Sequence, residues 1–291
     1  MEELSQPVET LAVPVAIPVG AYLRDHLVSG RVVLPAVEAL QILALTLPAA
    51  AGADPLRQER AFFGHLLAVE PGLERIPAIH EFSRNAEGRC RCRLLTVLSG
   101  RQVRWTRKVE HASVFFLPER GEEAAGEGPA GGFAENAAQG EAVFTVPRRR
   151  LYAELVPFGP AYQNVAGDVR LAASGGWAEL SGGDAPEAAG PLGSPFPADA
   201  AFHVACAWGQ RYRNTIAFPV GFAQRRIFAP TRAGESYSCR VVPLAGEGAT
   251  LHFDIGIFDG SGRPVEAILG VEMRDISGGK RRPPAWVREG I

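Results

Sequence analysis

Two stretches of the chain repeat the same order of apolar and polar segments. An apolar run after Pro35, from Ala36 to Leu47, is apolar on nearly every side, which is typical of a helix surrounded by other structure. Residues 198–211 form a second run of this kind. Each run is followed by four alternating segments that turn residues separate, which predicts strands. These strands are expected at 60–69, 79–84, 89–99 and 103–116, and at 221–228, 237–243, 250–258 and 265–275, with two more at 164–173 and 177–181 before the second helix.

The composition changes abruptly between the two stretches. From Pro118 to Glu141 the sequence consists of little besides Gly, Ala and Glu, and such a segment buries too little apolar area to order itself. We therefore expect a flexible linker at 118–141, between an N-terminal module at 1–117 and a C-terminal module at 142–291.

The repeated pattern of one long apolar helix and four alternating strands predicts a sheet curled around a helix. This arrangement is called a hotdog fold, and two in tandem make a double hotdog of the α+β class. The two modules would form a pseudo-dimer with its cleft between the helices. Two unrelated α+β modules are the alternative that the pattern leaves open.

Composition narrows the functional classes. The chain has 291 residues, 46% of them hydrophobic and 21% charged, with a net charge of −2. This balance argues against nucleic acid or an anionic membrane as the main partner. Pro14 and Pro18 interrupt the N-terminal apolar segment, so we expect no signal peptide, and no uninterrupted apolar run is long enough to span a bilayer. The four cysteines lack metal-site spacing, so we expect a reduced, cytoplasmic protein with no metal.

His26 and Asp199 are the candidate catalytic residues, because each lies at the start of one predicted helix. Histidine accepts protons near neutral pH. An aspartate in the apolar stretch 196–208 is expected to be pushed toward its neutral form by desolvation, as a proton donor requires. His203 lies one helical turn after Asp199, where it can orient the carboxyl or close a wall of the cleft. A structural role for either candidate is the competing interpretation.

The residues after His26 suit a substrate carbonyl. Gly30 permits a tight backbone turn, and Pro35 suits a helix start. The amides that follow, beginning with that of Ala36, would be unpaired donors at the positive end of a helix. They could hold a carbonyl oxygen that gains enolate character.

Four motifs resemble those of the dehydratase domains of modular polyketide synthases, and their order and spacing agree over nearly the whole chain. They are His26-x3-Gly30-x4-Pro35, Gly159-Pro160-Ala161-Tyr162-Gln163, Asp199-x3-His203 and Phe218-Pro219-Val220-Gly221.

The resemblance implies an enzyme, a hydro-lyase that removes water from a 3-hydroxyacyl thioester and leaves a 2,3-unsaturated acyl chain. The substrate would be carried on the phosphopantetheine of an acyl carrier protein, with other polyketide synthase domains as partners and no bound cofactor. By analogy, His26 takes the α-proton, Asp199 protonates the departing hydroxyl, and the amide of Ala36 or a neighbour binds the thioester carbonyl. Gly30, Pro35, Gly159, Pro160, Tyr162, Gln163 and His203 would support the site or bind substrate.

Three departures from the family pattern affect the site, and one of them is the short segment between Leu151 and Phe158, which Pro157 stiffens. The tyrosine before Gly159-Pro160 is replaced by Phe158, which has no hydroxyl, and Tyr162 or His203 is the expected substitute. The glycine that often follows the motif proline is replaced by Ala36, which keeps the amide but narrows the approach.

Other outcomes stay open at the level of sequence. The same fold and dyad serve double-bond isomerases and cyclases of the product-template or pyran-forming type, and an inactive hotdog could act as a binding module. Pairing into a homodimer, acyl length, stereochemistry, and whether the chain is free-standing or part of a synthase are also undecided.

Overall fold

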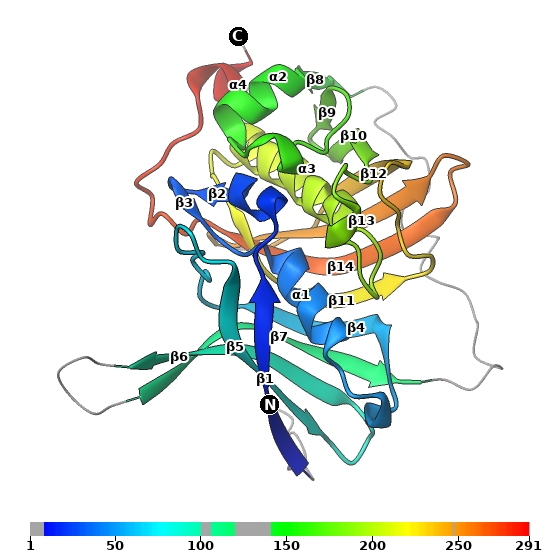
Figure 1. Cartoon of the computed structure of the whole chain (residues 1–291). Coiled ribbons are helices and arrows are strands. Elements are labelled where there is room, and N and C mark those ends of the chain that lie inside the picture. Colours follow the sequence, from blue (N-terminus) through cyan, green and yellow to red (C-terminus); the bar gives the residue numbers. More distant parts are fainter. Residues whose placement is uncertain (1–8, 100–105, 120–140, 247, 291) are drawn as a thin grey trace.

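The computed structural model describes residues 9–99, 106–119, 141–246 and 248–290, and most of its strands join one antiparallel sheet of 12 strands (Figure 1). The strand order is β1-β5-β6-β7-β4-β11-β14-β13-β12-β10-β9-β8. The first half of the sheet contains β1 (Glu9–Pro18), β4 (Ala53–Phe63), β5 (Arg75–Arg84), β6 (Cys90–Ser99) and β7 (Thr106–Pro118). The second half contains β8 (Phe144–Val146), β9 (Val169–Ala172), β10 (Gly175–Ser181), β11 (Phe218–Ile227), β12 (Ser236–Pro243), β13 (Leu251–Asp259) and β14 (Pro264–Arg274). The halves meet where β4 pairs with β11.

Each half of the sheet holds one long helix. The helix α1 (Ala36–Leu45) packs against β6 and β7, and α3 (Phe196–Tyr212) packs against β10, β12 and β13 (Figure 1). The two helices also contact each other. The shorter elements are β2 (Leu27–Val28), β3 (Arg31–Val32), η1 (Ala21–Asp25), η2 (Ala49–Ala51), α2 (Arg148–Arg150), η5 (Leu151–Leu155), η6 (Pro160–Tyr162), η7 (Pro186–Ala188) and α4 (Ala285–Glu289). The protein has the predicted α+β double hotdog fold.

Buried polar side chains join the two halves. Gln41 of α1 is buried, and its side-chain amide donates to the carbonyl of Gly193. The amide N–H of Leu192 donates in turn to Gln41 Oε1 at 3.1 Å. Because these backbone groups lie just before α3, Gln41 fixes the start of that helix relative to α1.

Several boundaries differ from the sequence-based expectation; the strand expected at 60–69, for example, begins already at Ala53, and the strand expected at 79–84 begins at Arg75. The strand expected at 60–69 leaves the sheet after Phe63, because Leu67 and Val69 pair instead with the segment that leads from β3 into α1. The strand expected at 164–173 begins only at Val169, and the first helix ends at Leu45.

The sequence-based expectation assigned no element to the segment that forms the edge strand β1, which contains Pro14 and Pro18. In the structure Pro14 pairs opposite Ile79 of β5. Proline lacks an amide donor, which an edge strand tolerates because only one of its sides is paired.

The linker predicted at 118–141 lies almost entirely outside the described residues, and β7 continues to Pro118. The division into modules at this point therefore stays a prediction. Within the described part of the chain, no helix is both long and apolar enough to cross a membrane.

Candidate active site

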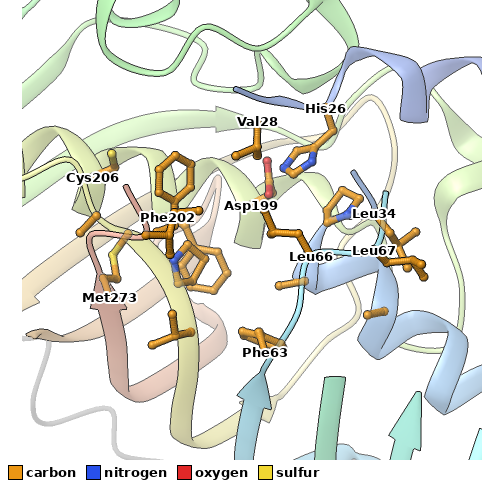
Figure 2. A pocket seen from close by; sticks show the side chains of 18 of the residues that line it. His26, Val28, Leu34, Phe63, Leu66, Leu67, Asp199, Phe202, Cys206 and Met273 are labelled. Atoms are coloured by element: carbon orange, nitrogen blue, oxygen red, sulfur yellow. The ribbon is translucent and has the colours of Figure 1, made fainter. Parts of the chain in front are cut away.

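A cavity of about 460 Å³ lies between the two halves and contains both predicted catalytic side chains. Among the lining side chains, those of Leu66 and Ile276 are exposed, whereas those of Cys206, Ala217 and Met273 are buried. Apolar side chains make up most of the wall, as Figure 2 shows. Its lining is His26, Val28, Leu34, Pro35, Ala36, Ala39, Phe63, Gly64, His65, Leu66, Leu67, His111, Val156, Phe158, Asp199, Phe202, His203, Cys206, Ala217, Phe218, Pro219, Val220, Met273 and Ile276.

His26 lies between η1 and β2, and its ring is held in one orientation. Its Nδ1 lies 2.9 Å from the carbonyl oxygen of Val33. Because a carbonyl only accepts, Nδ1 carries the proton and Nε2 keeps its lone pair. Ser29 and Gly30, both with positive φ, form the turn between β2 and β3 that brings Val33 back to His26. Gly30 therefore allows the backbone turn between β2 and β3, and it does not line the cavity.

The environment of His26 favours its neutral form. The side chain is buried, and this burial lowers the pKa of the imidazole, although nearby Asp199 opposes the effect. The side chains of His26 and Asp199 point toward each other (Figure 2). A neutral imidazole with a free Nε2 is the form that can accept a proton.

Asp199 and His203 lie one turn apart on α3 and are both buried. His203 Nε2 lies 3.0 Å from Asp199 Oδ2, yet neither atom completes a hydrogen bond within the described residues. The hydroxyl of Tyr152 accepts from the amide of Val165 at 2.8 Å and lies 3.4 Å from His203 Nδ1. The pair thus has unused hydrogen-bonding capacity beside the cavity.

Phe158 lies between the two histidines. Its ring centroid is 4.4 Å from that of His26 and 5.1 Å from that of His203. The position at which the family motif has a tyrosine therefore supplies an apolar wall to both imidazoles and no hydrogen bond.

The N-terminus of α1 opens onto the same cavity. Pro35 and Ala36 line it, and Ala39 is the residue whose amide donates back to the Pro35 carbonyl, at 3.0 Å. The amides that precede Ala39 lie in the first turn, where a helix has no internal acceptor for them. The helix start predicted at Pro35 is confirmed, and it can offer donors to a substrate oxygen.

The segment 159–163 supports the site from outside the cavity. The amide of Gly159 donates to the backbone carbonyl of Asp25 at 2.8 Å, and the amide of Ala161 donates to the Asp25 carboxylate, also at 2.8 Å. A Cβ on Gly159 would lie 2.5 Å from the Asp25 side chain. Pro160 begins η6, and Gln163 donates to the Phe158 carbonyl at 2.9 Å. These residues fasten the backbone beside His26 and do not line the cavity.

Tyr162 does not replace the missing hydroxyl in the cavity. Its side chain is fully buried behind His26, and its hydroxyl donates to Glu38 Oε1 at 3.3 Å. The hydroxyl turns away because Glu38 of α1 is a buried acceptor. Of the two substitutes expected for the lost tyrosine, only His203 lines the cavity.

Sequence reasoning did not assign several lining residues. Phe202 and Cys206 follow Asp199 at helical positions i+3 and i+7, so they share its face of α3. That spacing was a usable signal. Met273 of β14 gave no such signal, because only strand pairing in the folded sheet brings it to the cavity. Glu38, which does not line the cavity, was missed as well. A charged residue in an otherwise apolar helix is nevertheless a sign of an unusual environment.

The described residues contain no group of three or more His, Cys, Asp or Glu side chains placed to hold a metal ion. All four cysteines are buried and free.

Comparison with known proteins agrees with this geometry. The family model for the polyketide synthase dehydratase N-terminal domain matches residues 132–283, which is just over half of the chain. A comparison with curated proteins gave no match.

Solved structures show the same fold at low sequence identity. The dehydratase domain of a mycocerosic acid synthase-like polyketide synthase is 15% identical, with a TM-score of 0.69, and the match covers 92% of this chain and 91% of that one. A histidine-to-phenylalanine variant of the PpsC dehydratase domain from Mycobacterium tuberculosis is 18% identical, with a TM-score of 0.67. The match covers 94% of this chain and 98% of that one. A bifunctional dehydratase-cyclase domain of ambruticin biosynthesis is 21% identical with a TM-score of 0.62, covering 91% of each chain.

The family match spans most of the second half of the fold, and the structural matches span both halves that form the cavity. The chain belongs to the polyketide synthase dehydratase family.

Proposed function

We propose that the protein removes water from a 3-hydroxyacyl thioester carried on the phosphopantetheine of an acyl carrier protein, within or beside a polyketide synthase. The observation that carries the proposal is the pairing, in one apolar cavity, of a neutral His26 with Asp199. Family membership and the relative solved with C12:1-CoA support a thioester substrate. A histidine-to-phenylalanine variant of the CurJ dehydratase is described as inactive, which supports the need for a histidine in that protein.

The chemistry follows from the tautomer and the facing side chains. His26 Nε2 takes the proton from the α-carbon, and the C–H electrons pass into an enolate whose oxygen accepts from the first amides of α1, beginning with that of Ala36. The enolate then forms the double bond as the β-carbon–oxygen bond breaks, and Asp199 gives its proton to the departing hydroxyl, which leaves as water. The dyad is left as imidazolium and carboxylate, and transfer of one proton from His26 to Asp199 restores it. His203, whose Nε2 lies 3.0 Å from the carboxyl, is placed to form a hydrogen bond with it as the proton moves.

The test is mass spectrometry of a 3-hydroxyacyl carrier protein or its pantetheine surrogate. We expect the native chain to remove one water, about 18 mass units, His26→Ala to abolish the loss and Asp199→Asn to reduce it strongly. His252→Ala on β13 and Asp184→Asn on the surface are matched controls, because neither residue lines the cavity. The absence of water loss with both hydroxyl stereoisomers and several chain lengths would contradict the proposal.

Cyclisation is the second candidate, because the ambruticin relative is described as a dehydratase-cyclase. The same dyad could pass a proton between a chain hydroxyl and the new double bond. Ring closure does not change mass after dehydration, so the product of a substrate with a distal hydroxyl is assigned by NMR. A ring in place of the alkene would favour the cyclase.

A further inference from the structure

A buried carboxyl lies behind the proposed base. Glu38 is in the first turn of α1, and only 5% of its surface is exposed. Among the described residues, two tyrosine hydroxyls are its hydrogen-bond donors, that of Tyr22 to Oε2 at 3.4 Å and that of Tyr162 to Oε1 at 3.3 Å. Burial raises the pKa of Glu38 to about 8, so the group is mainly protonated at neutral pH. The proposed mechanism gives this acid no part.

Tyr162 connects Glu38 to His26. Its ring centroid lies 5.0 Å from that of His26 in an edge-to-face arrangement, and a second edge-to-face contact, at 5.4 Å, joins it to Phe196. The ring is fully buried and does not line the cavity. Its hydroxyl bond to Glu38 therefore determines where the ring is held against the imidazole.

His26 needs this support because its hydrogen bond fixes only one ring atom. The bond from Nδ1 to Val33 leaves the ring able to tilt about that contact. Phe158 packs on the ring at 4.4 Å and 33°, and Tyr162 meets it at 61°. Together the two aromatic rings limit the tilt that would move Nε2 away from the substrate α-carbon.

We propose that Glu38 is a positioning residue for His26 and acts through Tyr162, whose ring it holds against the imidazole. The inference rests on the proposed function, because it takes His26 as the base. The buried acid is thus part of the support of the active site, although it touches neither the cavity nor the substrate.

The charged and titratable groups around Glu38 come from three elements. Tyr22 of η1 and Tyr162 of η6 contact it directly, and Asp199 of α3 is close enough to disfavour its ionisation. Glu187 of η7 faces Tyr22. Ionising Glu38 would add a negative charge behind the dyad, so the pH profile of turnover reports on this network.

The test compares kcat and KM for dehydration in four variants at neutral pH, and it follows the pH profile of kcat for the native chain and Glu38→Gln. We expect Tyr162→Phe and Glu38→Leu to lower kcat about tenfold with KM changed less than about twofold, because neither residue lines the cavity. Glu38→Gln keeps an oxygen that accepts from Tyr162, so it should stay within about threefold of native turnover and lose any inflection in kcat near pH 8. Tyr212→Phe is the matched control, because its hydroxyl bonds the Leu171 carbonyl at 3.3 Å, away from the cavity.

Native kcat in Tyr162→Phe, or a loss expressed mainly in KM, would overturn the proposal. Nitrogen-15 NMR of the histidines gives a readout that does not need turnover, with the His26 signals assigned by their absence in His26→Ala. We expect the Nδ1–H tautomer in both chains, because the bond to Val33 is the contact about which the ring tilts. The Nε2 signal should be sharp in the native chain and broadened by ring motion in Tyr162→Phe. If the native chain shows no dehydration but the His26 signal broadens in Tyr162→Phe, the positioning role stands and the proposed function fails. An unchanged Nε2 signal in Tyr162→Phe would refute the positioning role.

Discussion

Replacing Glu38 with glutamine should stabilise the protein at neutral and alkaline pH, by an amount that grows with pH. The carboxyl has its pKa raised from 4.5 to about 8 by burial. Below about pH 4.5 it is protonated in both the folded and the unfolded chain and has no effect on stability. As the pH rises, the unfolded chain ionises first, so the folded state loses stability until Glu38 itself ionises near pH 8.

The magnitude follows from that interval. The pKa of Glu38 rises from 4.5 in the unfolded chain to about 8 in the folded chain. At about 1.4 kcal/mol per pH unit, the free energy of unfolding falls by about 5 kcal/mol in total, and about 3 kcal/mol of this loss is present at pH 7. Glutamine cannot ionise, but its amide nitrogen faces one tyrosine hydroxyl, which costs about 1 kcal/mol. We therefore expect Glu38→Gln to be about 2 kcal/mol more stable than the native chain at pH 7 and slightly less stable near pH 4.5.

The assay is equilibrium unfolding in urea from pH 5 to 8, followed by the fluorescence of the four tryptophans. Glu179→Gln, at an exposed carboxyl on β10, controls for the loss of one negative charge. A difference between variant and native chain that does not change with pH would refute the assignment of Glu38 as a buried neutral acid. So would a variant less stable than the native chain at pH 8.

Three further predictions concern turnover. Burial lowers the pKa of His26 below 6.5, so the base stays neutral when the pH falls to 6.5. The acid limb of the kcat/KM profile should therefore have its midpoint below pH 6.5. A midpoint above pH 6.5 would contradict the assignment of His26 as the base. Cys206→Phe adds a ring at a buried part of the cavity wall, so kcat/KM should fall at least about tenfold for long acyl chains and less for short ones. Equal losses at all lengths would argue against an acyl site beside Cys206. Gly159→Ala places a methyl group 2.5 Å from Asp25, so kcat should fall about 10- to 100-fold as the neighbouring His26 shifts, and native kinetics would show that this close contact is unnecessary.

Local sequence predicted the elements that carry the candidate dyad. Proline at the start of an apolar run placed the beginning of α1 at Ala36, and the apolar stretch around Asp199 placed α3. These features depend on residues a few positions apart, where helix propensity and capping act. Local sequence assigned no element at β1, because what makes this segment a strand is its pairing with β5 along one edge of the sheet.

Tertiary structure alone decided what surrounds the dyad. Glu38 and Tyr162 are 124 residues apart, and His203 meets Tyr152 across 51 residues. No local pattern records that a tyrosine hydroxyl turns away from the cavity toward a buried acid, or that Phe158 lies between two histidines. The sequence determined which side chains each half of the fold contributes. Their orientation, burial and protonation depend on packing between the halves, because desolvation and ring contacts arise only when distant segments exclude water together.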